Sequence, residues 1–389
     1  MKRDAGLFAL GFRPFYALAG IFAVAAIAVW LLSLAAVFHI GGYLPGVFWH
    51  SHEMVFGFAT AVMAGFLLTA VRNWTGLPTP TGLALAALAA VWFAGRVLII
   101  TGPPLLAAIV DVAFIPALAA AIAAPIIRSR NQRNYKIVVI LLLIALANVV
   151  FHLALRGLLP AWLIRTTVVT VLDLITLLFA IVAGRVIPAF TRNAIPESAP
   201  RHAGWLEFLS FGSLILIIVA RISDDWVPVS AMVPAVLLVI AAVSHAYRLA
   251  LWQPHLTVSN PLLWMMPVAY SWLPVALFLR ALAQYSVIGE AVWIHALTAG
   301  AISGLMLAMM MRSALGHTGR PLVAGGMEMG AFLVLQLAAI VRVAAGLFSE
   351  AHYLQVVVAS GILWMLAFGV FLTRYLPMLA RPRIDGRPG

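Results

Sequence analysis

The chain has 389 residues, of which 64% are hydrophobic and only 9% are charged, whereas about 25% are charged in a typical soluble domain. A soluble fold of this size cannot bury so much apolar surface, so the composition excludes a soluble protein. The formal net charge is +12, but the basic residues lie in short connections between apolar runs, which is typical of membrane topology rather than of nucleic-acid binding. The absence of cysteine excludes disulfides, thiolate metal sites and covalently attached c-type haem.

Apolar runs of about 20 residues follow one another along the chain, and each is long enough to cross about 30 Å of hydrocarbon. Alternating strand patterns are absent, so we expect helices, whose backbone groups bond to one another. The predicted fold class is all-α, a polytopic membrane protein of about twelve transmembrane helices in a single domain, 1–389. The expected helices cover residues 15–38, 49–71, 82–101, 104–127, 136–155, 163–188, 205–222, 228–252, 261–282, 291–312, 325–347 and 355–377. We interpret the polar connection 189–204 as a linker between two six-helix halves, about 1–188 and 205–380.

Lysine and arginine are distributed unequally between the two sides of the predicted membrane. Connections on the side of the N-terminus contain most of them, and the opposite side has only Arg156, Arg165, Arg221 and Arg280. Cytoplasmic connections of membrane proteins carry an excess of these residues. We therefore predict a multi-pass protein with both termini in the cytoplasm.

Arg165 and four other charged residues fall in the outer half of the predicted helices, the half that faces away from the cytoplasm, and we expect these four to be buried. They are Arg96, Asp111, Asp173 and Arg342. Each buried charge costs about 2.5–3.5 kcal/mol on insertion scales, so the four must face each other, a cofactor or water. They form either a structural set of ion pairs or the wall of a cofactor or ligand cavity, and intramembrane ionisable residues favour the second interpretation.

Histidines also gather in this outer zone, on three different helices. They are His50, His52, His152 and His295. Without cysteine, imidazole is the main metal ligand of the chain, and it suits haem iron, copper and zinc. His50 and His52 point about 200° apart on a regular helix, so both can bind one metal only if the first turn is unwound. Asn148 lies one turn below His152 on the same face, and Glu53 is spaced to hold the second nitrogen of His50.

Five segments of the sequence resemble the NnrS family. They are Gly11-Phe12-Arg13-Pro14-Phe15, Trp49-His50-Ser51-His52-Glu53-Met54-Val55-Phe56-Gly57-Phe58, Asn73-Trp74-Thr75-Gly76, Gly184-Arg185-Val186-Ile187-Pro188 and Gly316-His317-Thr318-Gly319-Arg320-Pro321-Leu322. Their order along the chain argues against coincidence. The resemblance implies a twelve-helix bacterial inner-membrane protein that carries haem b and copper and is linked to nitric oxide metabolism and protection from nitrosative stress.

Carried over position by position, the resemblance implies functional roles for nine residues. They are His50, His52, Glu53, Arg96, His152, Arg185, His295, His317 and Arg320. The segment Gly316 to Pro321 lies on the predicted cytoplasmic side, where its basic residues either meet a carboxylate or phosphate or hold a loop against lipid headgroups. Where the resemblance implies a histidine in the ninth helix, this chain has Pro267, so we expect one candidate ligand fewer.

The leading interpretation is a haem- and copper-binding membrane protein that handles nitric oxide or a related small ligand, as a redox enzyme or as a sensor. One alternative is a secondary transporter that uses the buried arginine and aspartate residues. Another is a copper delivery or assembly factor. The sequence does not identify an electron donor.

We expect the haem to be bound by His152 and His295, which lie at similar depth and supply the axial ligands that the cysteine-free chain otherwise lacks. Arg96 and Arg342 are expected to neutralise carboxylates, either the haem propionates or the aspartates of the outer half, because arginine binds carboxylate through two parallel hydrogen bonds.

We expect copper at the outer mouth of the second helix, on His50 and His52 with help from Glu53. Imidazole is the favoured copper(II) ligand among the side chains available. The alternative is that these histidines anchor the helix at the membrane interface, where amphipathic rings often lie.

Overall fold

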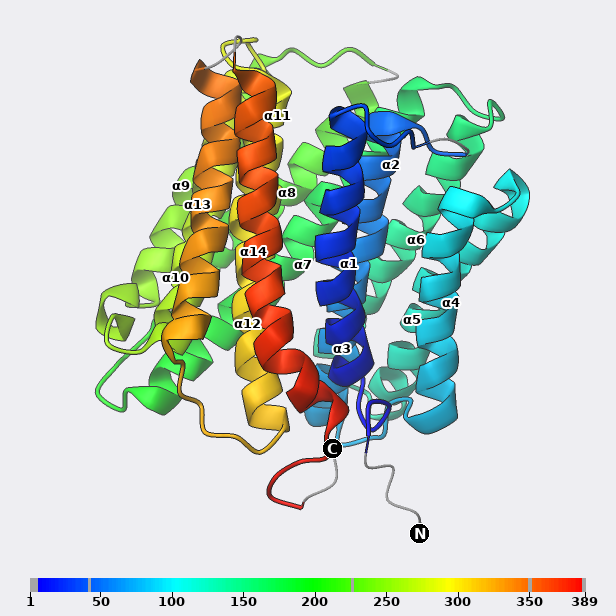
Figure 1. The fold of residues 1–389 in the computed structure, drawn as a ribbon. Helices are drawn as coiled ribbons and strands as arrows, with labels where there is room; N and C mark the ends of the chain where they lie inside the picture. Colours follow the sequence, from blue (N-terminus) through cyan, green and yellow to red (C-terminus); the bar gives the residue numbers. More distant parts are fainter. Residues whose placement is uncertain (1–5, 41–42, 225–226, 349–351, 387–389) are drawn as a thin grey trace. The chain divides into compact units, whose positions relative to one another are not determined.

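The computed structural model describes residues 6–40, 43–224, 227–348 and 352–386. Within these ranges the regular secondary structure is helical and contains no β-strand. Twelve helical stretches are long and apolar enough to cross a membrane, which confirms the predicted all-α fold and the number of spans (Figure 1).

Most spans are single α-helices. These are α1 (Phe12–Leu34), α4 (Gly82–Thr101), α5 (Pro104–Arg128), α6 (Tyr135–Leu155), α7 (Trp162–Ala194), α8 (Gly204–Asp224), α9 (Met232–Leu251), α10 (Pro261–Ala283), α13 (Gly326–Phe348) and α14 (Tyr353–Ala380). Two spans are divided by a π-helix. The second consists of α2 (Gly46–His52), η1 (Glu53–Ala59) and α3 (Thr60–Thr75), and the tenth of α11 (Glu290–His295), η4 (Ala296–Ile302) and α12 (Ser303–His317). Short 3-10 turns, η2 (Gln132–Asn134) and η3 (Pro254–Thr257), precede α6 and follow α9.

Two helices end later than expected, and both continue past a residue that usually marks a boundary. α7 continues through Pro188 to Ala194, so the first part of the expected linker is helical. A proline removes one backbone donor, but the rest of the helix can continue beyond it. α12 continues past Arg312, the expected end of its span, to His317. Arg312 is buried, so its charge does not mark the point where the helix leaves the protein interior.

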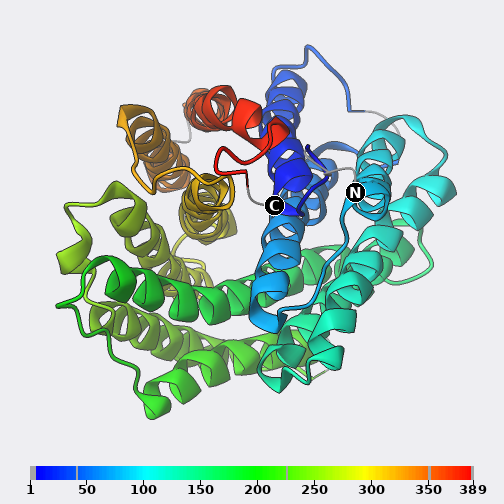
Figure 2. The ribbon, with the colours of Figure 1, turned by 90° about the horizontal axis from the view of Figure 1, so that it is seen from below.

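The chain divides into two compact units whose boundaries fall within α7, α12 and α14 and in the loop after α12. Unit 1 comprises residues 1–174, 312–321 and 368–389, and unit 2 comprises 175–311 and 322–367. In unit 1, α1 packs on α3 and η1, and α5 packs on both α4 and α6 (Figure 2). In unit 2, α9 packs on both α8 and α10, while η4 packs on α10 and α13.

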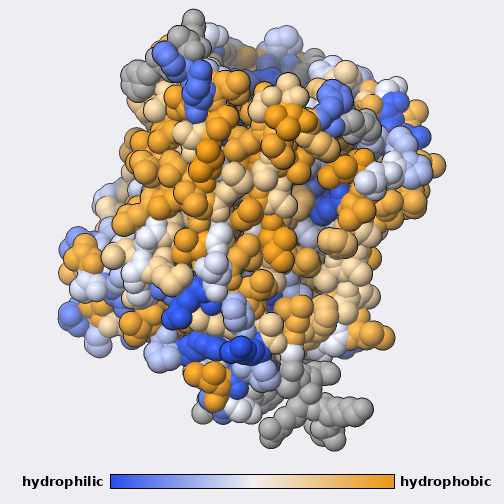
Figure 3. Space-filling model, viewed as in Figure 1, coloured by the Kyte–Doolittle hydropathy of each residue, from blue (hydrophilic) through white to orange (hydrophobic). Residues whose placement is uncertain are grey.

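Large apolar side chains are exposed along the candidate spans. Leu83 is 89% exposed and Phe208 is 77% exposed, and hydrophobic side chains cover much of the visible face in Figure 3. A surface of this kind is stable in hydrocarbon and not in water. The helices therefore suit a lipid bilayer, and the chain is a multi-pass membrane protein.

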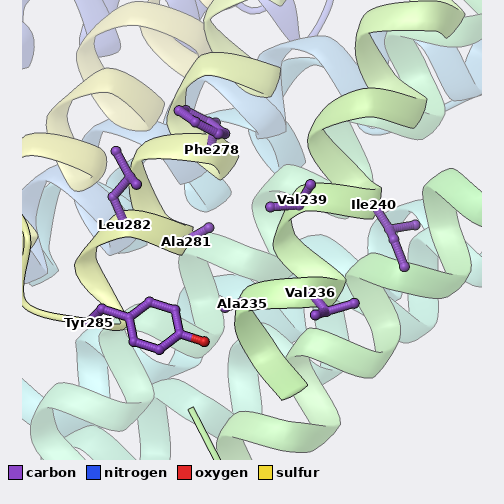
Figure 4. A pocket seen from close by; sticks show the side chains of 8 residues that line it. All are labelled: Ala235, Val236, Val239, Ile240, Phe278, Ala281, Leu282 and Tyr285. Carbon is purple, nitrogen blue, oxygen red and sulfur yellow. The ribbon is translucent and has the colours of Figure 1, made fainter. Parts of the chain in front are cut away.

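A groove of about 310 Å³ lies between α9 and α10. It is lined by Ala235, Val236, Val239, Ile240, Phe278, Ala281, Leu282 and Tyr285 (Figure 4). Among these side chains only the phenol of Tyr285 carries a polar atom. The lining of this groove is therefore almost entirely apolar.

Candidate metal centre

The second span changes its helical geometry directly after His52. α2 ends at this histidine, and the next seven residues, Glu53–Ala59, form the π-helix η1. Such segments are rare and occur frequently at functional sites. His52 and Glu53 are 0% and 1% exposed, so the change of geometry lies beside two fully buried polar side chains.

His50 and His52 face different surroundings, although only one residue separates them. The ring of His50 stacks on Trp30, with ring centres 4.7 Å apart and 14° between the planes. The ring of His52 packs against Phe151 at 5.0 Å and His152 at 5.2 Å. α2 is regular across both histidines, so the two side chains point apart as on any unbroken helix.

Both ring nitrogens of His52 face carboxylate oxygens. Nδ1 lies 2.9 Å from Oε1 of Glu53, and Nε2 lies 3.2 Å from Oδ2 of Asp111 on α5. A neutral imidazole carries only one N–H, so one of these nitrogens would then present its lone pair to a carboxylate oxygen. A second proton on the ring, a proton on one carboxyl group or a metal ion between the ring and the carboxylate would each resolve this arrangement.

Asp111 connects three further side chains at the centre of unit 1. Asn148 of α6 donates from Nδ2 to Oδ2 of Asp111 at 2.8 Å, and Nε2 of His152 lies 2.9 Å from the same oxygen. Arg96 of α4 forms an ion pair with Oδ1. Asn148 and His152 therefore do share one face of α6, as their spacing predicts, and the expected pairing of Arg96 with Asp111 is present.

Arg96 bridges two acids that come from different helices. Besides its ion pair with Asp111, its Nη1 donates to Oε1 of Glu53 at 3.0 Å. The close approach depends on Gly57 in η1, where a Cβ atom would lie 3.0 Å from Nη1 of Arg96 and 3.2 Å from Oε2 of Glu53. Trp92, one turn before Arg96 on α4, donates to the carbonyl of Gly57 at 3.0 Å and fixes the same backbone.

His152 has a second partner outside the membrane-spanning helices. Its Nδ1 lies 2.9 Å from the hydroxyl of Tyr43, and the two rings are stacked with 4° between their planes. Burial raises the pKa of Tyr43 to about 12. The hydroxyl therefore stays protonated at neutral pH and fixes the orientation of the imidazole ring, as the hydrogen-bonded partners of metal-ligating histidines do.

The group carries an unbalanced charge when its histidines are neutral. If both carboxyl groups are also ionised, Glu53 and Asp111 together face a single guanidinium, that of Arg96. Burying a net negative charge away from water is costly unless a cation compensates it. In that protonation state, one further positive charge would balance the group and would also fit the surroundings of His52.

His52, Asp111 and His152 are spaced as metal ligands. Each offers one ligand atom, and these atoms lie within 4.8 Å of one another. Ligand bonds of about 2.0–2.2 Å at angles between about 90° and 110° separate two ligand atoms by about 3.0–3.4 Å. The distances of 3.2 Å and 2.9 Å from Asp111 Oδ2 to the two imidazoles are close to that range. We call these three residues the His-Asp-His centre.

His295 repeats one feature of His52, because it too directly precedes a π-helix, η4. Its Nδ1 lies 2.7 Å from the carbonyl of Ala291, to which it donates. This bond leaves Nε2 as the unprotonated nitrogen, the form in which a histidine binds iron. His295 belongs to unit 2, whereas His152 belongs to unit 1, so their pairing on one haem stays a prediction.

The other predicted residues have the following surroundings within their own units. Arg342 of unit 2 donates to the hydroxyl of Tyr353 at 3.1 Å, and His317 of unit 1 packs on Phe12 with ring centres 5.5 Å apart. Asp173 is buried in α7. Arg185 on α7 and Arg320 after α12 are half-buried.

Unit 2 contains a second buried polar group that sequence reasoning missed. Arg248 of α9 donates two hydrogen bonds to Glu207 of α8, at 2.7 and 2.8 Å, and another to the carbonyl of Ala180 at 2.9 Å. It also donates to the hydroxyl of Tyr270 at 3.0 Å, and that hydroxyl lies 2.7 Å from Nδ1 of His245. Arg248 lies near the end of its helix, where a basic residue ordinarily indicates topology, so the sequence contains no signal for this network.

The position of Arg248 explains the glycine of the Gly184–Pro188 motif. A Cβ atom on Gly184 would overlap the guanidinium of Arg248, which approaches the α7 backbone closely. The guanidinium also lies over the rings of Phe211 and Trp252, at 4.8 and 5.0 Å from their centres. This motif therefore has a packing role that joins α7, α8 and α9.

Comparison with known proteins agrees with the resemblance of the motifs. No curated protein matches the chain. The model of the NnrS family, described as NnrS protein, matches residues 6–383, nearly the whole chain. With its twelve candidate spans and its buried histidine cluster, the chain belongs to the NnrS family.

Proposed function

We propose that the chain is a metal-binding membrane protein of the nitric oxide response, with its metal ion held by the His-Asp-His centre. The observation that supports this most strongly is His52, whose two ring nitrogens both face carboxylate oxygens. A metal ion on Nε2 resolves that conflict and supplies the missing positive charge. Glu53 and Tyr43 then hold the second nitrogens of the two ligating imidazoles, the usual support of metal-bound histidines.

Copper is the metal that this donor set and the family favour. Imidazole nitrogen together with carboxylate oxygen suits copper(II), and the chain contains no cysteine that would favour a thiolate site. In this assignment His52 and His152 belong to one centre, Glu53 supports it, and His50 lies outside. A bound copper ion would supply a redox-active metal to which nitric oxide or a related small ligand can bind.

We further propose that haem b is bound in unit 2, with His295 as a ligand of the iron. The hydrogen bond from Nδ1 to the Ala291 carbonyl supports this assignment, because it orients the ring and leaves Nε2 in its metal-binding form. The π-helix that follows His295 is a second supporting feature, since the other π-helix follows a residue of the His-Asp-His centre.

Arg342 is suited to pair with a propionate of that haem. A Cβ atom on Gly346 of α13 would lie 2.7 Å from Cγ2 of Val292 on α11, so the two helices touch there. α13 runs antiparallel to the tenth span in Figure 1. Arg342, one turn before Gly346, and His295, about one turn after Val292, are therefore at similar depth on neighbouring helices.

The metal assignment can be tested with two histidines of the same helix. We expect purified wild-type protein, supplied with copper, to contain about one copper ion per chain, and His52→Ala to lose it. His50→Ala is the matched control, because it removes an imidazole two residues away that lies outside the proposed centre. Elemental analysis and the copper(II) electron paramagnetic resonance signal provide the readout. Equal loss in both variants would contradict the assignment.

The competing occupant of the site is a proton, which would make His52 an imidazolium between Glu53 and Asp111. That reading favours the transporter alternative, in which a buried group of acids and bases carries protons or ions. The same experiment separates the two. Two results together would favour the transporter. The wild-type protein binds no metal after copper is supplied, and it takes up protons that the Asp111→Asn variant does not take up.

A further inference from the structure

The segment that follows α14 folds back onto the end of α12 within unit 1. The backbone N–H of Ile384 donates to the carbonyl of Thr318 at 3.2 Å. Nη1 of Arg383 donates to the carbonyl of His317 at 2.9 Å, and the same guanidinium binds both carboxylate oxygens of Asp385 at 2.9 and 2.6 Å. The loop after α12 and the C-terminal segment are thereby held together.

Arg13 connects the start of α1 to the backbone at the C-terminal end of α14. It is 0% exposed, and its Nη1 donates to the carbonyls of Leu379 and Arg381 at 2.9 and 2.5 Å. A cation at the last carbonyls of a helix satisfies acceptors that have no partner within the helix. The backbone around the ends of α12 and α14 is therefore fixed by several independent bonds.

Three arginines gather at these joined ends. Arg320 follows α12, Arg374 lies in the last turns of α14, and Arg381 follows α14. Burial lowers the pKa of Arg320, and the nearby charges of Arg374 and Arg381 lower it further, so both of these cations are close enough to repel Arg320. Nη1 of Arg320 is buried and has no hydrogen-bond partner among the residues that the structure describes. Figure 3 shows hydrophilic side chains over the lower end of α14.

We propose that Arg320, Arg374 and Arg381 bind a phosphate group. Each guanidinium presents parallel N–H donors that match two oxygens of a phosphate. A bound phosphate would offset the repulsion that Arg374 and Arg381 exert on Arg320 and would give Nη1 of Arg320 an acceptor. Arg13 and Arg383 bind backbone carbonyls at the ends of α14 and α12. The backbone that carries the three arginines is therefore fixed and is not a freely exposed loop.

The phosphate has two chemical sources. α12 and α14 both end candidate membrane spans here, so the headgroup of an anionic phospholipid such as phosphatidylglycerol is within reach. Soluble inorganic phosphate presents the same oxygens. A basic residue that marks only topology differs from this cluster, and Arg192, exposed at the end of α7, represents that class.

The test measures thermal unfolding of the full chain in nanodiscs of phosphatidylcholine alone and of phosphatidylcholine with phosphatidylglycerol. We expect the anionic lipid to raise the unfolding temperature of the wild type and of Arg192→Gln. The apparent affinity for phosphatidylglycerol should fall by about tenfold in Arg320→Gln and in Arg381→Gln, the loss expected when a hydrogen bond to a charged group is removed. Arg320→Lys keeps the positive charge but lacks the parallel N–H donors of a guanidinium. Its affinity for phosphatidylglycerol should fall by an intermediate amount.

A second arm adds inorganic phosphate to nanodiscs of phosphatidylcholine alone. Stabilisation there that depends on Arg320 identifies soluble phosphate as the source, and stabilisation confined to phosphatidylglycerol identifies the lipid headgroup. Unfolding in phosphatidylcholine without phosphate shows whether each variant still folds as the wild type does. The proposal is overturned if correctly folded Arg320→Gln and Arg381→Gln respond to both additions as Arg192→Gln does, because the arginines then mark topology only.

Discussion

Nε2 of His52 and Oδ2 of Asp111 lie 3.2 Å apart, and both side chains are at most 2% exposed. The other nitrogen of His52 is occupied by Glu53 at 2.9 Å. When the imidazole is neutral and its proton faces Glu53, nothing donates across the gap to Asp111. A metal ion in this gap would make the centre a metal site and a proton would make it a proton site, so variants of its acidic residues distinguish the two.

Asp111→Asn is expected to reduce bound copper by about tenfold or more, because even residues that only support metal ligands change metal affinity by about 10- to 100-fold. Asparagine has nearly the same shape but no charge, and the remaining Glu53 and Arg96 then balance each other. Elemental analysis of the purified protein gives the copper content. Asp173→Asn, which changes another buried aspartate of unit 1, is the control. Equal copper in the two variants would show that Asp111 is not a ligand.

Arg96→Gln is expected to destabilise the protein by about 3–5 kcal/mol, the cost of removing one partner from a buried ion pair. It leaves the carboxylates of Glu53 and Asp111 without their shared cation. The double variant Arg96→Gln, Glu53→Gln restores the charge balance of the wild type and should recover part of the loss. Thermal unfolding in detergent gives the readout. A single variant as stable as the wild type would show that the two ion pairs contribute little.

Gly57→Ala is expected to destabilise unit 1 by about 1–3 kcal/mol, the usual cost of overpacking, and to lower copper retention. The added Cβ would lie 2.7 Å from the ring of Phe22 and 3.0 Å from Nη1 of Arg96. The matched control is Gly369→Ala, also in a helix of unit 1, where a Cβ meets nothing within 4 Å. Unfolding temperature and copper content are measured for both. If the two variants behave alike, the close approach at Gly57 is not required.

The spans could be predicted from the sequence because the length and apolarity of a membrane-crossing helix are local properties. Helix boundaries were predicted less well at residues that can lie either at the end of a helix or within it. Pro188 was interpreted as the end of α7 and Arg312 as the end of α12, yet each lies within its helix. Whether a proline or a charge ends a helix depends on what packs around it, and the local sequence does not contain that information.

The sequence predicted which residues are candidates for the site, but not which of them touch one another. Depth in the membrane placed His52, Asp111 and His152 in the same zone, because depth follows from position along each span. Which of them touch depends on the rotation of each helix and on the π-helix after His52. The adjacent histidine, His50, stacks on Trp30 instead. Arg248 was missed because a basic residue near a helix end looks the same from the sequence whether it faces lipid headgroups or a buried carboxylate.

Gly184→Ala is expected to destabilise unit 2 by at least about 1–3 kcal/mol, because the new methyl group would overlap the guanidinium of Arg248. Moving the guanidinium would break its paired hydrogen bonds with Glu207. Gly212→Ala on α8 is the control, since a Cβ there meets nothing within 4 Å. Unfolding temperatures compare the two. A Gly184→Ala protein as stable as Gly212→Ala would show that Arg248 can move without loss.

His295→Ala is expected to remove most of the bound haem, measured as the Soret absorbance per chain of the purified protein. The reason is that His295 combines a hydrogen bond to a backbone carbonyl, which fixes its tautomer, with a position directly before the second π-helix. The control is His245→Ala, which removes another histidine of unit 2. His245 is fully buried and bonded to Tyr270, so its loss should lower the unfolding temperature but leave the Soret absorbance per folded chain unchanged. If His245→Ala loses haem and His295→Ala keeps it, the haem lies beside the Arg248 network. If both keep it, neither histidine is a ligand of the iron, and the His-Asp-His centre is the next set of histidines to test.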